Sequence, residues 1–128
     1  MGAERVVVAP MVQYEEPDWR PLEHVLGEDL CGSFMWMHEA QTAGGRRIHA
    51  YKHIETRRYV HLDLRGCAFV YVDKDRYRRL PLATALELAL APWWEELDAS
   101  WEEVAAVWGA IDRARRGSGR TRNKSGGE

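Results

Sequence analysis

The apolar pattern of this chain changes its period twice, and that change restricts the fold more than any other feature of the sequence. Across residues 32–72, apolar and polar side chains alternate with a period of two, which is typical of half-buried β-strands. Three short breaks, AGG, ETR and LRG, divide this region. We therefore predict four short strands, at about 33–41, 47–54, 58–63 and 67–72, joined as an antiparallel meander.

Helical spacing flanks the strands on both sides. The stretch PDWRPLEHVLG predicts a short helix that Asp18 can cap and Gly27 can end. Beyond residue 81, leucine and tryptophan recur every three or four positions, and we expect a kink or a new start at Pro92. Ser100 and Glu103 match a capping box at the start of the last helix. The apolar positions that follow in that helix are Trp101, Val104, Trp108 and Ile111.

These elements define a fold class and three segments. A chain of 128 residues with 45% hydrophobic residues forms one globular domain. We predict an α+β fold, in which a four-stranded antiparallel meander sheet carries a short N-terminal helix and two C-terminal helices packed on it. Residues 17–116 form this domain, and residues 1–16 are an N-terminal extension in which RVVVA could add an edge strand. Residues 117–128 contain no apolar side chain and are predicted to be a disordered basic tail.

Charge alternates along the chain although the formal net charge is only −2. Residues 1–42 carry −6 and residues 81–112 carry −7, whereas residues 43–80 carry +6 and residues 113–128 carry +5. The acidic and basic segments belong to one small fold, so this pattern favours an acidic helical layer that neutralises a basic sheet.

The strand registers follow from the requirement that apolar residues share a face, because a slip of one residue inverts every side chain. An odd-numbered loop at residues 55–57 places Ile54 and Val60 on one aliphatic face. This loop requires a left-handed backbone conformation at Arg57, at a cost of about 1 kcal/mol. The alternative two-residue turn would mix apolar and polar residues on both faces.

The two other loops complete the predicted sheet. The GG of the first loop fits a two-residue turn, and LRG fits a three-residue loop with Gly66 in the left-handed position. With these registers, the second face of the sheet is aromatic and histidine-rich, and Arg57 lies at its rim. The candidate binding residues are Trp36, His38, Tyr51, His53, Tyr59, His61, Tyr71 and Arg57.

Catalytic and metal chemistry is weakly supported on this face. His49 and His53 are four residues apart on one strand, so their Cα atoms lie about 13 Å apart and cannot share an ion. No thiolate or carboxylate joins the histidines at a familiar spacing, and we predict neither a metal nor a cofactor. His53 and His61 with Lys52 or Arg57 are residue types that a metal-free ribonuclease would use, although Lys52 is predicted to point to the other face. We rank this activity below binding.

Binding is the function that this face predicts. An exposed aromatic face is typical of a protein-binding or regulatory module, and the simplest partner is a second copy of the chain in a homodimer. The alternative is a single-stranded nucleic-acid-binding protein that stacks bases on the same rings. A third interpretation stays open, in which the tryptophan-bearing helices cover the face and bury it as a second core.

The remaining features concern the compartment. No apolar run approaches the roughly 18 residues of a membrane span, and the N-terminal apolar stretch is too short for a signal peptide. Cys31 and Cys67 stand alone, which is typical of reduced thiols. We therefore expect a cytoplasmic protein without a membrane partner.

Overall fold

A computed structural model describes residues 4–7, 16–42, 44–73 and 76–125. The elements follow in the order β1 (Glu4–Val7), α1 (Arg20–Leu26), α2 (Glu28–Cys31), β2 (Phe34–Thr42), β3 (Arg47–His53), β4 (Tyr59–Asp63), β5 (Ala68–Asp73), β6 (Arg76–Leu80), α3 (Leu82–Glu95) and α4 (Trp101–Ser125). The predicted α+β class with an antiparallel meander is confirmed, and the predicted strands correspond to β2–β5 within a residue or two at their ends.

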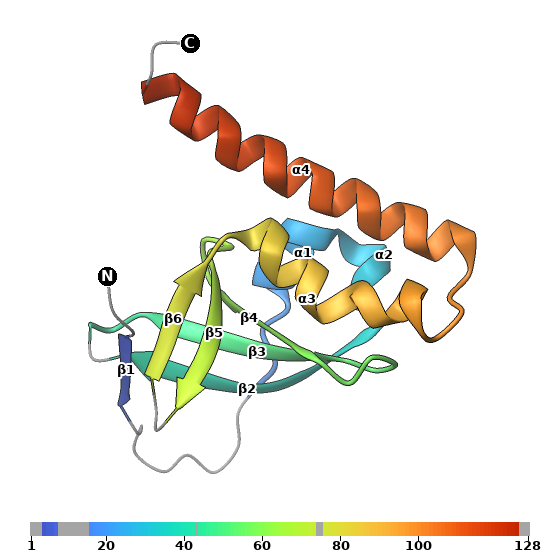
Figure 1. The fold of residues 1–128 in the computed structure, drawn as a ribbon. Coiled ribbons are helices and arrows are strands. Elements are labelled where there is room, and N and C mark those ends of the chain that lie inside the picture. Colours follow the sequence, from blue (N-terminus) through green and yellow to red (C-terminus); the bar gives the residue numbers. More distant parts are fainter. Residues whose placement is uncertain (1–3, 8–15, 43, 74–75, 126–128) are drawn as a thin grey trace.

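The prediction of four strands is wrong because two further strands close the sheet into a barrel (Figure 1). β1 pairs with β2 through Val6 and Thr42 and with β6 through Glu4 and Tyr77, so the expected edge strand joins both ends of the sheet. β6 was missed because its sequence RYRRL is rich in arginine, and Tyr77 is its one buried residue. Both edges of the meander are therefore paired.

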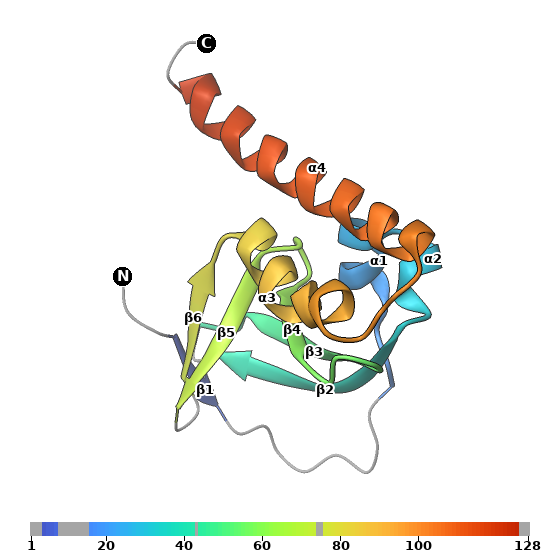
Figure 2. The ribbon, with the colours of Figure 1, turned by 45° about the vertical axis from the view of Figure 1, so that its right-hand side comes forward.

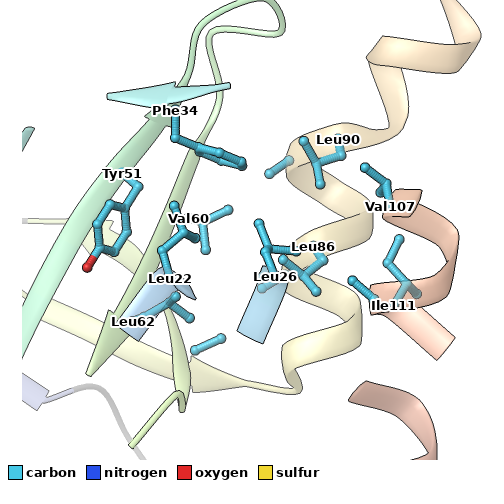
Figure 3. Close-up of a cluster of buried hydrophobic side chains, with 14 of the residues drawn as sticks. Leu22, Leu26, Phe34, Tyr51, Val60, Leu62, Leu86, Leu90, Val107 and Ile111 are labelled. Carbon is cyan, nitrogen blue, oxygen red and sulfur yellow. The ribbon is translucent and has the colours of Figure 1, made fainter. Parts of the chain in front are cut away.

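The helices form layers on one side of the sheet (Figures 1 and 2). α1 and α3 contact the sheet directly, and α4 packs on α1 and α3. The two C-terminal helices were predicted to pack on the sheet, but α4 lies one layer further out. Figure 3 shows the core between these layers, in which leucines of α1 and α3 meet sheet residues on one side and α4 on the other. Its labelled members are Leu22, Leu26, Phe34, Tyr51, Val60, Leu62, Leu86, Leu90, Val107 and Ile111.

A smaller apolar cluster lies on the other side of the sheet, away from the helices. It consists of Ile48, Phe69 and Tyr77, with Ala40 and Cys67 packed against them. Strand β3 therefore has apolar neighbours on both of its faces. This explains why six of its seven residues are buried or half-buried, although successive side chains point to opposite faces.

The ends of the helices largely match their sequence signals. Ser100 and Glu103 form the predicted capping box, because the Glu103 N–H donates to Ser100 Oγ at 3.2 Å. Gly27 ends α1 with φ of 88°, as expected. Asp18 acts one position before the N-cap, where its Oδ1 accepts the Arg20 N–H at 3.1 Å. α3 continues past Pro92 to Glu95 without a new start.

α4 runs on to Ser125, into the segment for which the sequence predicts disorder. Once a helix has been nucleated, each added residue contributes one further backbone hydrogen bond.

One predicted register is confirmed and two are wrong. His61 pairs with Phe69 across β4 and β5, and Gly66 has φ of 85°, as the LRG loop requires. Across β3 and β4, however, Lys52 pairs with Tyr59 and Tyr51 with Val60, which is the register that the sequence argument rejects. Between β2 and β3, Thr42 and Arg46 enclose a three-residue connection in place of the two-residue turn.

The β3–β4 loop shows why its register differs from the prediction. The His53 N–H donates to the Arg58 carbonyl and the Arg57 N–H to the His53 carbonyl, both at 2.9 Å, so the connection has four residues, 54–57. The side chain of His53 then accepts the N–H groups of Glu55 and Thr56. Arg57 does adopt the expected left-handed conformation, with φ of 66°. Hydrogen bonding within the loop therefore outweighs the sorting of apolar residues onto one face.

Candidate functional site

The predicted aromatic and histidine face is divided between the two sides of the sheet. Because β3 and β4 pair one residue away from the predicted register, Tyr51 and Tyr59 point to opposite faces. Trp36, Tyr51 and His53 lie on the side that the helices cover. His38, Tyr59, His61 and Tyr71 lie on the other side, and Arg57 is exposed in the β3–β4 loop.

On the covered side, Tyr51 attaches the N-terminal segment to the sheet. Its side chain is fully buried, and its hydroxyl donates to the Asp18 carbonyl at 2.6 Å. The ring of Trp19 lies 5.6 Å from the Tyr51 ring. Burial raises the pKa of Tyr51 above its ordinary value, so the hydroxyl stays protonated and acts as a donor. This residue has a structural role.

The two buried histidines of β3 also have structural roles. His49 accepts the Trp36 indole N–H at Nδ1, at 3.2 Å. His53 accepts two loop N–H groups at Nδ1, and its ring packs against Trp93 with centroids 4.4 Å apart. Each ring therefore carries its proton on Nε2. Burial lowers the pKa of both histidines, which keeps them neutral near pH 7.

On the uncovered side, four rings form a connected group. Tyr59 stacks on His61 with centroids 5.6 Å apart and planes 11° apart, and Tyr77 meets both His61 and Tyr71 edge to face, at 5.2 and 5.5 Å. The Lys52 ammonium lies 5.8 Å from the centroid of Tyr59. We call Lys52, Tyr59, His61, Tyr71 and Tyr77 the tyrosine face.

The outer rings of the tyrosine face are accessible. Tyr59 is 41% exposed and Tyr71 is 50% exposed, whereas Tyr77 is buried beneath them. Burial, with a smaller contribution from the charge of His38, lowers the pKa of His61 to about 4. His61 is therefore a neutral ring at neutral pH. The sequence identified three members of this face but missed Lys52 and Tyr77, because both depend on the true register and on β6.

A second aromatic surface lies on α3 and α4, and the sequence did not identify it. Trp101 is 77% exposed and Trp108 is 41% exposed, and Trp108 packs on Trp94 with centroids 5.0 Å apart. Leu97, which is also exposed, lies in the segment between the two helices. We call Trp94, Leu97, Trp101 and Trp108 the tryptophan surface.

Helix geometry explains how these tryptophans come to the surface. Positions 101 and 108 are seven residues apart, so they lie on nearly the same side of α4, about 10 Å apart along its axis. The buried residues Val104, Val107 and Ile111 form a neighbouring stripe that faces the core. The sequence pattern merged the two stripes into one. On α3, Trp93 is buried and donates to the Glu55 carboxylate, while Trp94 is half-buried and packs on Trp108.

The charges around the tryptophan surface are segregated along α4. Acidic residues are exposed at the start of α4 and just before it, and arginines follow about three to four turns later. Two of these arginines make ion pairs on the helical layer, Arg115 with Glu87 and Arg116 with Asp112, both at 2.6 Å. The acidic residues are Glu95, Glu96, Asp98, Glu102 and Glu103.

The described residues offer little for catalysis or metal binding. His53 and His61, the pair on which the ribonuclease hypothesis depends, lie on opposite faces of the sheet. Among the residues that the structure describes, no three His, Cys, Asp or Glu side chains are grouped so that they could hold a metal ion. Cys31 and Cys67 are free thiols, and burial raises the pKa of Cys31 to about 11, which makes it a poor nucleophile at neutral pH.

Comparison of this chain with models of protein families, with curated proteins and with solved structures finds no match. Within the described ranges, none of the helices has the length and apolar character needed to span a membrane. The fold and its surfaces thus define a small α+β barrel protein with one aromatic surface on its helices and another on its sheet.

Proposed function

We propose that this protein is a protein-binding module that self-associates as a homodimer through its tryptophan surface. The observation that carries the proposal is the 77% exposure of Trp101 beside the partly exposed Trp108. Tryptophan is enriched among the residues that dominate binding energy at interfaces, and contiguous exposed apolar patches mark interaction sites. The sequence analysis also favoured a protein-binding module, but it placed the binding surface on the sheet, whereas we propose a surface on the helices.

The tryptophan surface is preorganised for binding. Trp108 is held against Trp94, and both extend from regular helices that the apolar core fixes in place. Ala105, between the two tryptophans of α4, is small and exposed, so a partner helix can approach closely there. A rigid surface of this kind loses little conformational entropy when a partner covers it.

The charge distribution favours a second copy of the chain as the partner. In an antiparallel pair of α4 helices about a two-fold axis near Ala105, Trp101 of one copy meets Trp108 of the other. The arginines at 113–116 of each copy then extend past the start of α4 of the other copy, toward the acidic residues Glu95, Glu96 and Asp98 that precede it. Such an interface is self-complementary, as a two-fold dimer requires.

Sedimentation velocity of the full chain at increasing protein concentration tests this proposal. We expect the parent protein to form a dimer in a concentration-dependent manner. Trp101→Ala should weaken dimerisation by about 30-fold or more, since truncation of a central tryptophan costs about 2 kcal/mol or more. Added salt should weaken the dimer modestly, because the charged groups are exposed and screened.

Tyr59→Ala is the matched control, because it removes a partly exposed aromatic ring from the side of the sheet that lies away from the helices. It should dimerise like the parent. A parent protein that remains monomeric at every concentration would contradict the proposal, and so would a Trp101→Ala protein that dimerises as strongly as the parent.

A further inference from the structure

We infer that the tyrosine face binds single-stranded nucleic acid by stacking bases on Tyr59 and Tyr71. This inference is independent of the tryptophan surface, which lies on the helices. It assigns a ligand class to the part of the predicted sheet face that the helices leave uncovered.

The strand registers place the two tyrosines on one face. His61 pairs with Phe69 across β4 and β5, and Tyr59 and Tyr71 each lie two residues beyond that pair in the same direction along the sheet. Two half-exposed rings on neighbouring strands can each stack one base of an extended strand. Bases within a duplex are already stacked on one another, so this arrangement selects unpaired nucleotides.

Rings beneath the two tyrosines hold them in position. His61 lies parallel to Tyr59 at 5.6 Å, and Tyr77 meets Tyr71 edge to face at 5.5 Å. Tyr59 and Tyr71 therefore keep one ring face or edge against the protein while the remaining surface is open to solvent. A fixed ring loses little freedom when a base stacks on it, which increases the affinity per contact.

The electrostatics of the molecule favour a polyanion on this side. Lys52 lies over the Tyr59 ring, where its ammonium can contact a phosphate next to a stacked base. The segment 43–80, which supplies β3–β6, carries +6, although Arg47 and Arg58 of this segment bond to Glu39 and to the Leu88 carbonyl on the helix-covered side. The acidic segment 81–112 forms α3 and the first half of α4. Those helices pack on the opposite face of the sheet, so the acidic charge faces away from the tyrosines.

Fluorescence anisotropy with short labelled oligonucleotides tests the inference. Oligo(dT) and oligo(rU) probes of about eight nucleotides fall within the site sizes of small single-strand-binding domains and are too short to bridge a dimer. We expect the parent protein to bind them, and Tyr59→Ala to bind between about fivefold and a hundredfold more weakly. Tyr59→Phe keeps the ring and should bind like the parent.

Lys52→Ala tests the phosphate contact separately. It should lower the slope of log affinity against log salt by about 0.7, the value for one phosphate contact on a single strand. Trp101→Ala is the control on the other surface and should leave oligonucleotide binding unchanged. Loss of dimerisation and loss of oligonucleotide binding are thus measured with different variants, so one proposal can fail without the other.

Several results would overturn the inference. These are a parent protein that binds neither probe, a duplex of the same sequence that binds as tightly as the single strand, or equal binding by parent and Tyr59→Ala. Circular dichroism shows whether each variant is folded. Should Tyr59→Ala not fold, Tyr71→Ala on the neighbouring strand must show the same loss of affinity, and unchanged binding by that variant would reject the inference.

Discussion

Tyr51 on β3 and Tyr59 on β4 are the same residue type on paired strands, yet they lie in opposite environments. Tyr51 is fully buried under the helices, with its hydroxyl bonded to the Asp18 carbonyl. Tyr59 lies on the other face, stacked on His61 and partly open to solvent. The pairing of Tyr51 with Val60 and of Lys52 with Tyr59 alone produces this difference. Register, rather than residue type, decides which tyrosine stabilises the fold and which one is available to a ligand.

The histidines repeat the same contrast. His53 on the covered side uses Nδ1 to hold the β3–β4 loop and packs its ring against Trp93. His61 on the uncovered side serves as a flat neutral support between Tyr59 and Tyr77. On the covered side, the Nδ1 atoms of His49 and His53 are bonded within the protein, although their buried Nε2 atoms have no hydrogen-bond partner among the described residues. On the uncovered side, the outer rings Tyr59 and Tyr71 are partly exposed to solvent.

The largest expected effect compares the two tyrosines directly. Tyr51→Ala should lower the free energy of unfolding by about 3–5 kcal/mol, because it leaves a cavity in the core and removes the bond to Asp18. Tyr59→Ala should lower it by about 1 kcal/mol or less, since the ring is already partly solvated. Urea denaturation followed by tryptophan fluorescence measures both values.

Tyr51→Phe refines this comparison by removing the hydroxyl alone. It should cost about 1 kcal/mol, the usual net contribution of one hydrogen bond. Equal destabilisation by Tyr51→Ala and Tyr59→Ala would show that the two faces do not differ as the structure indicates.

An intermediate effect concerns pH and involves both faces. Burial lowers the pKa of His49, His53 and His61 in the folded state, and that of His61 to about 4, below the unfolded value near 6.5. At a pH between the folded and the unfolded pKa values, the unfolded chain therefore binds more protons than the folded chain. Stability should be complete above about pH 6.5 and should fall as the pH drops below it, by up to about 1.4 kcal/mol per pH unit for each histidine.

His61→Phe isolates the contribution of the uncovered side. Phenylalanine keeps a flat ring between Tyr59 and Tyr77 but cannot titrate, so unfolding free energy should depend less steeply on pH between about 6.5 and 5. The difference should reach about 2 kcal/mol at pH 5, from the slope for one group. Urea titrations at pH 7, 6 and 5 give the comparison. An unchanged slope would mean that His61 is protonated equally in the folded and unfolded chain.

Structural features that depend on residues close together in the sequence were predicted, and features that depend on distant contacts were not. The alternation of period two predicted β2–β5, and Gly66 predicted one register, because these depend on neighbouring residues. The β3–β4 register depends on the side chain of His53 accepting loop N–H groups, which no apolar pattern reveals. Strand β6 forms because it pairs with β1 and β5, whereas its own composition is typical of an exposed segment.

The candidate sites differ in the same way. Tyr59, His61 and Tyr71 of the tyrosine face were identified, but they were grouped with Tyr51 and His53, which the true register assigns to the core. Trp101 and Trp108 share helical spacing with Val104 and Ile111, so the sequence pattern did not separate the exposed tryptophans from the buried residues. A helix carries two neighbouring apolar stripes here, and only the packing of α4 on α1 and α3 determines which stripe is buried.

The smallest expected effect concerns the end of α4, where the sequence contains no apolar side chain. Residues 118–128 contain no apolar side chain, although the helix continues to Ser125. Their deletion removes backbone hydrogen bonds of a helix end that exchange readily with water, so the free energy of unfolding should change by less than about 0.5 kcal/mol. Thermal and urea unfolding of the truncated chain measure this change, with the full chain at the same pH and salt as the control. If stability came from helix length rather than from the buried stripe of Val104, Val107 and Ile111, the deletion would lower the melting temperature by several degrees. An unchanged melting temperature would instead place the stabilising contribution of α4 in the part that packs on α1 and α3.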